Sequence, residues 1–370
     1  MTAVLADTFR GRSVFLTGHT GFKGSWLAIW LHRLGARITG YALPPPTEPC
    51  NFVVSEVRAL LAAHHEADLR DAARVEQALS AADPDIVLHL AAQALVRESY
   101  VRPRETFETN ILGTVNVLEA IRTRGKPCVV VVVTSDKCYE NREQLWGYRE
   151  RDPMGGHDPY SASKGAAEIV TAAYRRSFFP PEHLSEHGVK LATARAGNVI
   201  GGGDWAKDRI LCDAARALAA GQPVPVRNPS AVRPWQHVLE PLSGYLTLAA
   251  RLLASDEPGW CEAWNFGPLP GDDIPVRQLV DLFVTAWDQG GVGVSPARWE
   301  DKSDPHQPHE AGLLRLSIDK AIARLGWRPR WNVAEAVRRT ATWYRQAHCA
   351  TGADMRRACL DDIAAYEALQ

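Results

Sequence analysis

Apolar and polar positions in the first half of the chain follow two alternating patterns. Cys128–Ser135 holds five consecutive valines, and an apolar run of this length is typical of a strand buried on both faces. Gly24–Leu34 instead repeats its large apolar residues at intervals of three and four, which predicts a helix with one buried stripe. Strands that alternate with helices in this way predict βαβ units and a parallel sheet covered on both faces.

The same patterns predict the other elements of this half. Strands are expected at Ser13–Thr17, Arg37–Ala42, Asp85–Ala91, Cys128–Ser135 and Lys190–Ala196. Helices are expected at Gly24–Leu34, Asp71–Ala81, Pro103–Arg122 and Asp158–Ser177. We therefore predict an α/β fold with a Rossmann-type doubly wound parallel sheet over residues 1–196. Such sheets bind their ligands at the carboxyl ends of the strands.

The pattern loosens after Arg195, where prolines interrupt the chain. Helices at Asp208–Ala220 and Val276–Trp287 and a strand at Trp264–Phe266 are expected there. We expect residues 233–263 to complete the Rossmann-type domain. Residues 197–232 and 264–370 are then expected to form a smaller, discontinuous substrate-binding lobe.

Composition narrows the class of protein. The 370 residues carry a formal net charge of -1, so no overall field draws the protein to nucleic acid or to an anionic membrane. The seven cysteines form no C-x-x-C pair, which argues against a disulfide framework and a cysteine zinc site and favours a reducing cytoplasm. The first residues lack a basic region followed by an apolar run, so we expect no signal peptide, and no apolar stretch reaches the about 18 residues of a membrane span. We expect no bound metal.

Three glycines follow the first predicted strand and open the next helix, which is the position of a dinucleotide-binding loop. Glycine lets the backbone approach a pyrophosphate, and the helix N-terminus supplies N–H donors. We expect the whole loop to contact the cofactor: Gly18, His19, Thr20, Gly21, Phe22, Lys23 and Gly24. His19 and Lys23 either add positive charge near the phosphates or point to solvent. The alternative for the loop is a plain turn between strand and helix.

Other strand ends extend the expected cofactor pocket. The second strand ends in Thr39-Gly40-Tyr41, with no carboxylate for the adenosine ribose and no arginine for a 2′-phosphate, so NAD is favoured over NADP. The further residues assigned to the cofactor are Asp68, Leu69, Leu90, Ala91, Ala92, Gln93, Thr109 and Thr134. Taken singly, each of them is equally well an ordinary structural residue.

Tyr160 and Lys164 are four residues apart, so a helix places both side chains on one face. An ammonium beside a phenol favours the phenolate and is expected to lower the pKa of Tyr160. A tyrosine of this kind takes a proton from an alcohol, while both residues also lie against the cofactor. The alternative is a solvent-exposed pair on a surface helix. Together with the glycine loop, the pair predicts redox chemistry on a hydroxyl group.

Ser135, Asp136 and Lys137 follow the central strand and are expected to face the same pocket as Tyr160. Oxidation of an alcohol requires neither an acid nor an amine here. An elimination requires both, because a leaving hydroxyl must be protonated and a carbon-bound hydrogen removed. The alternative is that Asp136 caps the following turn and Lys137 is solvated.

Polar residues of the second half are candidates for the substrate. Arginine suits a diphosphate because its guanidinium binds oxygens in pairs. The residues assigned to the substrate are Asn198, Asp204, Trp205, Arg209, Arg227, Arg233, His237 and His306. His306 and His309 lie in Asp-Pro-His-Gln-Pro-His-Glu, where prolines disfavour a metal cluster and favour a loop that closes on the substrate.

From Gly11 to about Trp343, the chain resembles the extended short-chain dehydrogenase/reductase family, and within it the cytidine branch of the nucleotide-hexose dehydratases. The segments that carry the resemblance are GHTGFKGSWL (18–27), AAQALVRESY (91–100), TSDKCYENRE (134–143), YRERDPMGGHDPYSASKGAAE (148–168), RAGNVIGGGDWAKDR (195–209) and RPWQHVLEPLSGYL (233–246). The resemblance implies NAD as cofactor and CDP-glucose as substrate. It also implies a homodimer or a dimer of dimers, built on helices at Arg104–Arg122 and Asp158–Arg176.

The resemblance further implies a redox cycle that is closed within the enzyme. Tyr160 takes the O4 proton, Asp136 protonates the departing C6 hydroxyl, and Ser135 orients the hexose. Relatives that act on dTDP-glucose carry Asp-Glu where this chain has Asp136 and Lys137. Lys137 either removes the C5 proton or holds a water or the sugar. The competing functions are a nucleotide-sugar epimerase or dehydrogenase on the same fold, and an NAD-binding protein without catalysis.

Overall fold

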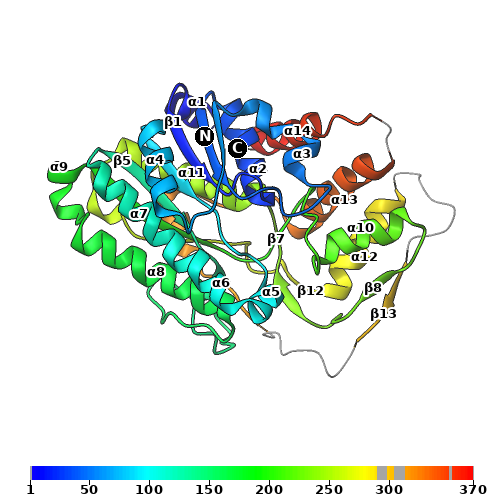
Figure 1. Cartoon of the computed structure of the whole chain (residues 1–370). Coiled ribbons are helices and arrows are strands. Elements are labelled where there is room, and N and C mark those ends of the chain that lie inside the picture. Colours follow the sequence, from blue (N-terminus) through cyan, green and yellow to red (C-terminus); the bar gives the residue numbers. More distant parts are fainter. Residues whose placement is uncertain (1, 290–297, 304–312, 350–351, 370) are drawn as a thin grey trace.

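The computed structural model describes residues 2–289, 298–303, 313–349 and 352–369. Its centre is a seven-stranded sheet with strand order β11-β6-β5-β4-β1-β2-β3, in which every neighbouring pair is parallel (Figure 1). The strands are β1 (Ser13–Thr17), β2 (Arg37–Ala42), β3 (Ala63–Glu66), β4 (Ile86–His89), β5 (Cys128–Val133), β6 (Val189–Ala196) and β11 (Ala263–Phe266). The order reverses between β1 and β4, which confirms the predicted doubly wound sheet.

Alternation along β5 shows how the sheet is covered. Val129, Val131 and Val133 belong to one core cluster and Val130 and Val132 to the other, so both faces of the strand are buried. The first cluster includes α1 (Thr2–Phe9), α2 (Phe22–Arg33) and α11 (Leu239–Ala254). The second includes α4 (Ala72–Ala82), α7 (Gly113–Arg124) and α8 (Pro159–Ser177), which lie together in Figure 1.

The helix predicted at Pro103–Arg122 is interrupted. It consists of α6 (Pro103–Phe107), a π-helical turn at η2 (Glu108–Leu112) and α7. A π turn inserts one residue into the helix and frequently marks a functional site. This turn contains the buried Asn110.

Short elements connect the main ones. The short helices are α3 (Asn51–Val54), η1 (Val57–Leu60), α5 (Val96–Val101), η3 (Asp136–Cys138), η4 (Pro181–His183), α9 (Leu184–His187), η5 (Pro258–Trp260) and η6 (Ala321–Leu325). No helix of the described residues combines the length and hydropathy needed to cross a membrane.

The second lobe consists of helices and three small two-stranded sheets. Its helices are α10 (Ile210–Ala219), α12 (Val276–Asp288) and α13 (Val333–Cys349). The sheets pair β7 (Val199–Ile200) with β10 (Gln236–His237), β8 (Val224–Val226) with β13 (Trp299–Asp301), and β9 (Val232–Pro234) with β12 (Asp273–Pro275). The last helix, α14 (Met355–Ala368), returns to the central sheet, where Trp30 of α2 donates from Nε1 to Glu367 at 2.8 Å.

One contact joins the two halves through a glycine. The indole nitrogen of Trp26 in α2 donates to the carbonyl oxygen of Gly202 at 2.8 Å. A Cβ atom at Gly202 would lie 2.0 Å from the ring of Trp343 in α13. The loop that follows β7 therefore depends on the absence of a side chain at this position.

We predict that Gly202→Ala lowers the free energy of unfolding by about 1–3 kcal/mol, because the added methyl group overpacks the contact with Trp343. Chemical denaturation of the purified variants measures this. Gly267→Ala is the matched control, since its Cβ atom would meet Ile318 at an ordinary 3.5 Å. Equal stabilities of the two variants would contradict the prediction.

Candidate active site

The glycine loop between β1 and α2 packs closely against neighbouring backbone, both its own and that after β4. Gly18 has φ +77°, in the left-handed region, and a Cβ atom there would lie 2.8 Å from the backbone of Ala91. A Cβ atom at Gly24 would lie 2.1 Å from the carbonyl oxygen of Gly18. At Gly21 the same contact would be 3.4 Å, which is ordinary. The fold thus requires glycine at 18 and 24, whereas at 21 it leaves room for a ligand.

His19 is fully buried and packs against β2 and β3. Its Nε2 lies 2.7 Å from Nδ1 of His64, and its ring meets Phe52 edge-on at 5.5 Å. The ring also occupies the place of a side chain at Gly40. Burial and the neighbouring His64 lower the pKa of His19 to about 3. Both expectations for His19 are therefore wrong: it neither carries positive charge near the phosphates nor points to solvent.

Lys23 is partly buried at the start of α2. Burial lowers its pKa to about 8, and Asp136 acts in the opposite direction. The other charges that act on its ammonium are Arg209, Lys164 and Asp204. Lys23 therefore belongs to the charged groups around the candidate catalytic residues and is not a solvent-facing side chain.

Tyr160 and Lys164 lie on the first two turns of α8, which is capped by the carboxylate of Asp158. They are only 9% and 6% exposed, so the alternative of a surface pair is wrong. Lys164 Nζ donates to the carbonyl oxygen of Val133 at 3.4 Å. Burial raises the pKa of Tyr160 to about 12, opposed by a hydrogen bond to Ser135, and it lowers the pKa of Lys164 to about 8. The expected lowering of the Tyr160 pKa is absent here because burial dominates.

Ser135, Asp136 and Lys137 form the turn that follows β5. Ser135 Oγ donates to Asp136 Oδ1 at 2.8 Å and accepts from the N–H of Lys137 at 3.2 Å. Ser135 is therefore the residue that caps η3, and the alternative of a capping Asp136 is wrong. Lys137 Nζ lies 3.9 Å from Asp136 Oδ1, with the lysine side chain 30% and the aspartate 3% exposed. An acid and an amine thus meet beside Tyr160.

The residues assigned to the cofactor lie along the same edge of the sheet. Thr17 Oγ1 accepts from the backbone N–H groups of Leu90 and Ala91, which fixes the chain where β4 ends. Asp68 is bound by Arg70 through its backbone N–H at 2.8 Å and through its guanidinium. Leu69 packs under Gly113 at the start of α7.

Asn110 escaped the sequence reasoning. From the π turn it donates to the carbonyl oxygen of Gln93 at 3.0 Å and to Ser163 Oγ at 2.8 Å, and it accepts from the N–H of Gln93. It thereby ties the strand end after β4 to α8, next to Lys164. A lone asparagine in a predicted helix gives no signal in the sequence, because the π turn that orients it is not visible there. Thr109, its neighbour in the same turn, is partly exposed.

Charged residues assigned to the substrate gather after β7. Arg209 Nε lies 3.4 Å from Asp204 Oδ2, and Arg227 pairs with Asp208 at 2.6 Å. Arg97 of α5, which the sequence reasoning missed, lies 3.7 Å from the same Asp208.

The remaining substrate assignments are Asn198, Arg233 and His306, besides the two large rings described below. The backbone carbonyl oxygen of Asn198 accepts a hydrogen bond from the N–H of Gln236. Arg233 donates to the carbonyl oxygen of Val232 at 2.9 Å. His306 lies outside the described residues.

Trp205 and His237 pack in the core, and their assignment to the substrate stays a prediction. Trp205 is 4% exposed and packs against Trp343 and Tyr344. His237 is fully buried between Trp26 and Trp331, at ring distances of 5.8 and 4.8 Å. Burial lowers the pKa of His237 to about 3, so the ring is neutral. Both stand in sequence next to polar candidates, but their apolar ring surfaces are used for packing.

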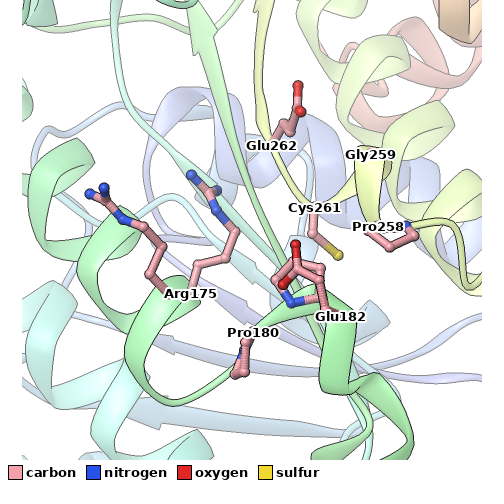
Figure 2. A pocket seen from close by; sticks show the side chains of 9 residues that line it. Arg175, Pro180, Glu182, Pro258, Gly259, Cys261 and Glu262 are labelled. Atoms are coloured by element: carbon pink, nitrogen blue, oxygen red, sulfur yellow. The ribbon is translucent and has the colours of Figure 1, made fainter.

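A cavity of about 320 Å³ lies at the other end of α8 (Figure 2). Arg175, Pro180, Glu182, Pro258 and Cys261 are among the residues that line it. None of the candidate catalytic or cofactor residues lines this cavity, because Tyr160 and Lys164 lie at the beginning of the helix. The candidate active site is therefore the carboxyl edge of the sheet.

Comparison with known proteins gives a consistent picture. The family model described as GDP-mannose 4,6 dehydratase matches residues 15–340. The CDP-glucose 4,6-dehydratase of Salmonella typhimurium is 49% identical over 337 residues, which are 91% of each chain. A dTDP-glucose 4,6-dehydratase of Streptomyces antibioticus is 30% identical over 281 residues, 75% of each chain.

Solved structures share the fold. A UDP-glucose 4-epimerase of Thermus thermophilus, in complex with NAD, has a TM-score of 0.75 at 26% identity and covers 90% of this chain and 99% of its own. A dTDP-glucose 4,6-dehydratase of Streptomyces venezuelae, with NAD and TYD bound, has a TM-score of 0.73 at 23% identity and covers 90% and 97%.

Two alanine substitutions separate the glycines that the fold requires from the one that faces a ligand. We predict that Gly21→Ala leaves thermal stability unchanged but weakens NAD binding about tenfold or more, or about 1.4 kcal/mol, because its methyl group meets the pyrophosphate. Gly24→Ala is expected to lower stability by about 1–3 kcal/mol. Calorimetric titration with NAD and thermal unfolding measure the two effects. Normal NAD binding by Gly21→Ala would place the pyrophosphate elsewhere.

Proposed function

The chain belongs to the GDP-mannose 4,6-dehydratase family, within the extended short-chain dehydrogenases/reductases, and on that premise we propose that it is a lyase that dehydrates CDP-glucose. The product is CDP-4-dehydro-6-deoxyglucose, and the cofactor is NAD. The observation that carries the proposal is the meeting of Asp136 and Lys137 beside Tyr160. An epimerase or a simple dehydrogenase has no need of this acid and amine. The choice of cytosine rests on the 49% identical relative.

The glycine loop and the strand ends of β2, β4 and β5 would hold NAD, which supplies a hydride acceptor that returns the hydride in the same turnover. The room at Gly21 and the N-terminus of α2 fit a pyrophosphate. Lys164, buried and next to this edge, provides an ammonium for the nicotinamide ribose. NAD is thus regenerated in each cycle and is not consumed.

The protein groups account for the proton transfers of the proposed reaction. Tyr160, as its phenolate, would remove the proton of the C4 hydroxyl while the hydrogen on C4 leaves as a hydride, which bound NAD would accept, so that C4 becomes a ketone next to C5. The hydrogen on C5 is then acidic, and Lys137 is placed to take it. Asp136 gives its proton to the C6 hydroxyl, which departs as water. Lys137 would return its proton to C5 as the hydride returns to C6. The proton held by Tyr160 must then pass, directly or through solvent, to Asp136, so that the enzyme is restored and the net change is the loss of one water.

The substrate side follows from the charges after β7. Arg209 and Arg227, each held by an aspartate, are proposed to bind the diphosphate. We propose that residues 197–232 and 267–349 form the substrate lobe, and that 1–196 with about 233–266 hold NAD, since the strand at Ala263–Phe266, expected in the substrate lobe, pairs with β6 in the central sheet. Because α14 packs against α2, we place it with the NAD-binding half.

Exposed apolar residues support a homodimer, alone or as half of a dimer of dimers. Val101, Phe107 and Leu112 are 73%, 37% and 53% exposed along α5, α6 and η2, and Ile169 of the adjacent α8 is 58% exposed. Phe107, Leu112 and Ile169 lie within the two segments expected to dimerise, Arg104–Arg122 and Asp158–Arg176, and Val101 lies just before the first of them. The seven cysteines are free thiols, which supports a cytoplasmic location.

Incubation of the enzyme and NAD with one nucleotide hexose at a time tests the reaction and the base preference. We predict that mass spectrometry shows the loss of one water from CDP-glucose, without net formation of NADH. dTDP-glucose, UDP-glucose and GDP-mannose are the controls and are expected to remain intact. An isomerised sugar, or accumulating NADH, would move the protein to the epimerase or dehydrogenase class.

Asp136→Asn separates oxidation from elimination. We predict that this variant still oxidises C4, seen as absorbance of bound NADH at 340 nm, but loses water at least about 100-fold more slowly, because the leaving hydroxyl lacks its acid. Tyr160→Phe is the companion variant and is expected to lose both steps. Unchanged dehydration in Asp136→Asn would remove the acid role from this residue.

A further inference from the structure

Glu168 is a buried carboxylate on the catalytic face of α8. It follows Lys164 by four residues and Tyr160 by eight, so the three side chains form one stripe along the helix. Only 4% of Glu168 is exposed. A carboxylate this deep in the protein is costly unless other groups pair with it, which makes its partners informative.

Three side chains bind Glu168, one from the end of β5 and two from β6. Thr134, which follows β5, donates to Oε1 at 2.5 Å. Thr193 and Arg195 of β6 donate to Oε2 at 2.8 and 2.7 Å. Burial works to raise the pKa of Glu168, but Arg195 and the hydroxyl groups outweigh it and hold that pKa below its ordinary value. Glu168 is thus an anion whose position fixes α8 against the ends of β5 and β6.

Arg195 extends this network to the turn that carries the acid and the amine. Its guanidinium donates to the Tyr139 hydroxyl at 2.6 Å and lies over the Tyr139 ring at 5.0 Å. Tyr139 directly follows η3, and its hydroxyl donates in turn to Asn265 of β11 at 2.8 Å. Thr134 precedes the same turn. Contacts from Glu168 therefore hold the chain on both sides of Ser135, Asp136 and Lys137.

Titratable groups from four elements surround Lys164: α2, β4, η3 and its own helix α8. Lys23 of α2 repels it, and His89 of β4 and Cys138 of η3 are kept uncharged by burial, which lowers the histidine pKa to about 3 and raises the thiol pKa. Burial lowers the pKa of Lys164 to about 8, and Glu168 acts in the opposite direction. Glu168 is the carboxylate that offsets the burial of this ammonium.

We propose that Glu168 is a positioning residue of the active site, which keeps Lys164 an ammonium and holds the Ser135–Lys137 turn in register with Tyr160. The proposal rests on the proposed function for its catalytic meaning, but not for its electrostatic part. A merely structural ion pair with Arg195 would stabilise the fold and leave the titration of Lys164 unchanged. That difference makes the two roles separable.

The test is the titration of Lys164 in the intact protein, followed by NMR of ¹³Cε-labelled lysines, with Lys164→Met to assign the signal. We expect Glu168→Gln to lower the Lys164 midpoint by about one pH unit or more, because an adjacent opposite charge is lost. Glu168→Asp keeps the charge and is expected to leave the midpoint within about half a unit. An unchanged midpoint in Glu168→Gln overturns the proposal, whatever happens to stability.

Two further variants control for folding. Asp362→Asn removes a carboxylate that Arg339 binds at 2.9 Å on α13 and α14, and it is expected to cost stability without moving the Lys164 midpoint. If Glu168→Gln does not fold, because Arg195 is left as a buried uncompensated charge, the double variant Glu168→Gln/Arg195→Met takes its place. It is expected to show the same lowered midpoint.

Activity gives the second readout. In Glu168→Gln the limb of the pH–rate profile that requires protonated Lys164 is expected to move to lower pH, with about a tenfold loss of kcat at pH 8 and little change in KM. A uniform loss at all pH values would overturn the electrostatic role. If the wild-type protein dehydrates no nucleotide hexose, the proposed function fails, while the NMR midpoints still decide the role of Glu168.

Discussion

The burial of charge along one face of α8 is the constraint on which the active site depends. Tyr160, Lys164 and Glu168 are each at most 9% exposed, and each buried ion costs several kcal/mol unless it is paired. The pairing groups come from the ends of β5 and β6, so the helix can lie against the sheet in one register only. The same contacts fix the turn after β5, where Asp136 and Lys137 stand. On our proposal, the same ion pair between Glu168 and Arg195 supports both the stability of the fold and the geometry of the active site.

Burial also explains why the lysines near the carboxyl edge of the sheet are charged while the buried histidines are neutral. His19, His89 and His237 lie inside the protein, and no carboxylate of the described residues lies within hydrogen-bonding distance of them. Burial lowers their pKa values to about 3. Lys23 and Lys164 keep pKa values near 8 under the same penalty, because Asp136 and Glu168 offset part of it. Positive charge at this edge of the sheet is therefore carried by lysine and arginine, while the histidines serve as packing groups.

The sequence predicted the helices and strands whose buried residues form a clear apolar pattern. β5 is apolar throughout and β1 has an apolar centre, α8 carries its buried residues at helical spacing, and the large apolar residues of α2 recur at that spacing. All four are confirmed within about two residues, although α2 is buried continuously over residues 24–31 and not along one stripe. β3 has the sequence Ala-His-His-Glu and escaped prediction, because this edge strand carries no apolar run. The π turn at Glu108–Leu112 was missed for another reason. It depends on the contacts of Asn110, which leave no periodic signal in the sequence.

For the candidate site, the spacing between residues along the chain indicated which side chains share a face. A position next to a polar candidate in the sequence did not indicate a shared site. The four-residue interval of Tyr160 and Lys164 and the position of the glycine loop placed these groups at one edge of the sheet. Trp205 and His237 adjoin polar candidates in the sequence, but sequence neighbours do not show that their rings pack against other aromatic rings in the core. Arg97, Asn110 and Glu168 were missed because each acts through tertiary contacts. The raised pKa of Tyr160 likewise follows from burial that no local pattern reveals.

Fold similarity alone does not decide the reaction. A UDP-glucose 4-epimerase and a dTDP-glucose 4,6-dehydratase resemble this structure equally well, with TM-scores of 0.75 and 0.73. Both reactions can begin with a tyrosine that deprotonates a sugar hydroxyl beside NAD. They diverge only after the ketone forms, when elimination requires a proton donor for the hydroxyl on C6 and an acceptor for the hydrogen on C5. In the proposed mechanism these groups are two adjacent residues, Asp136 and Lys137, whose side-chain atoms lie 3.9 Å apart. If both proposals hold, the difference between two classes of enzyme rests on a short segment that a buried ion pair keeps in place.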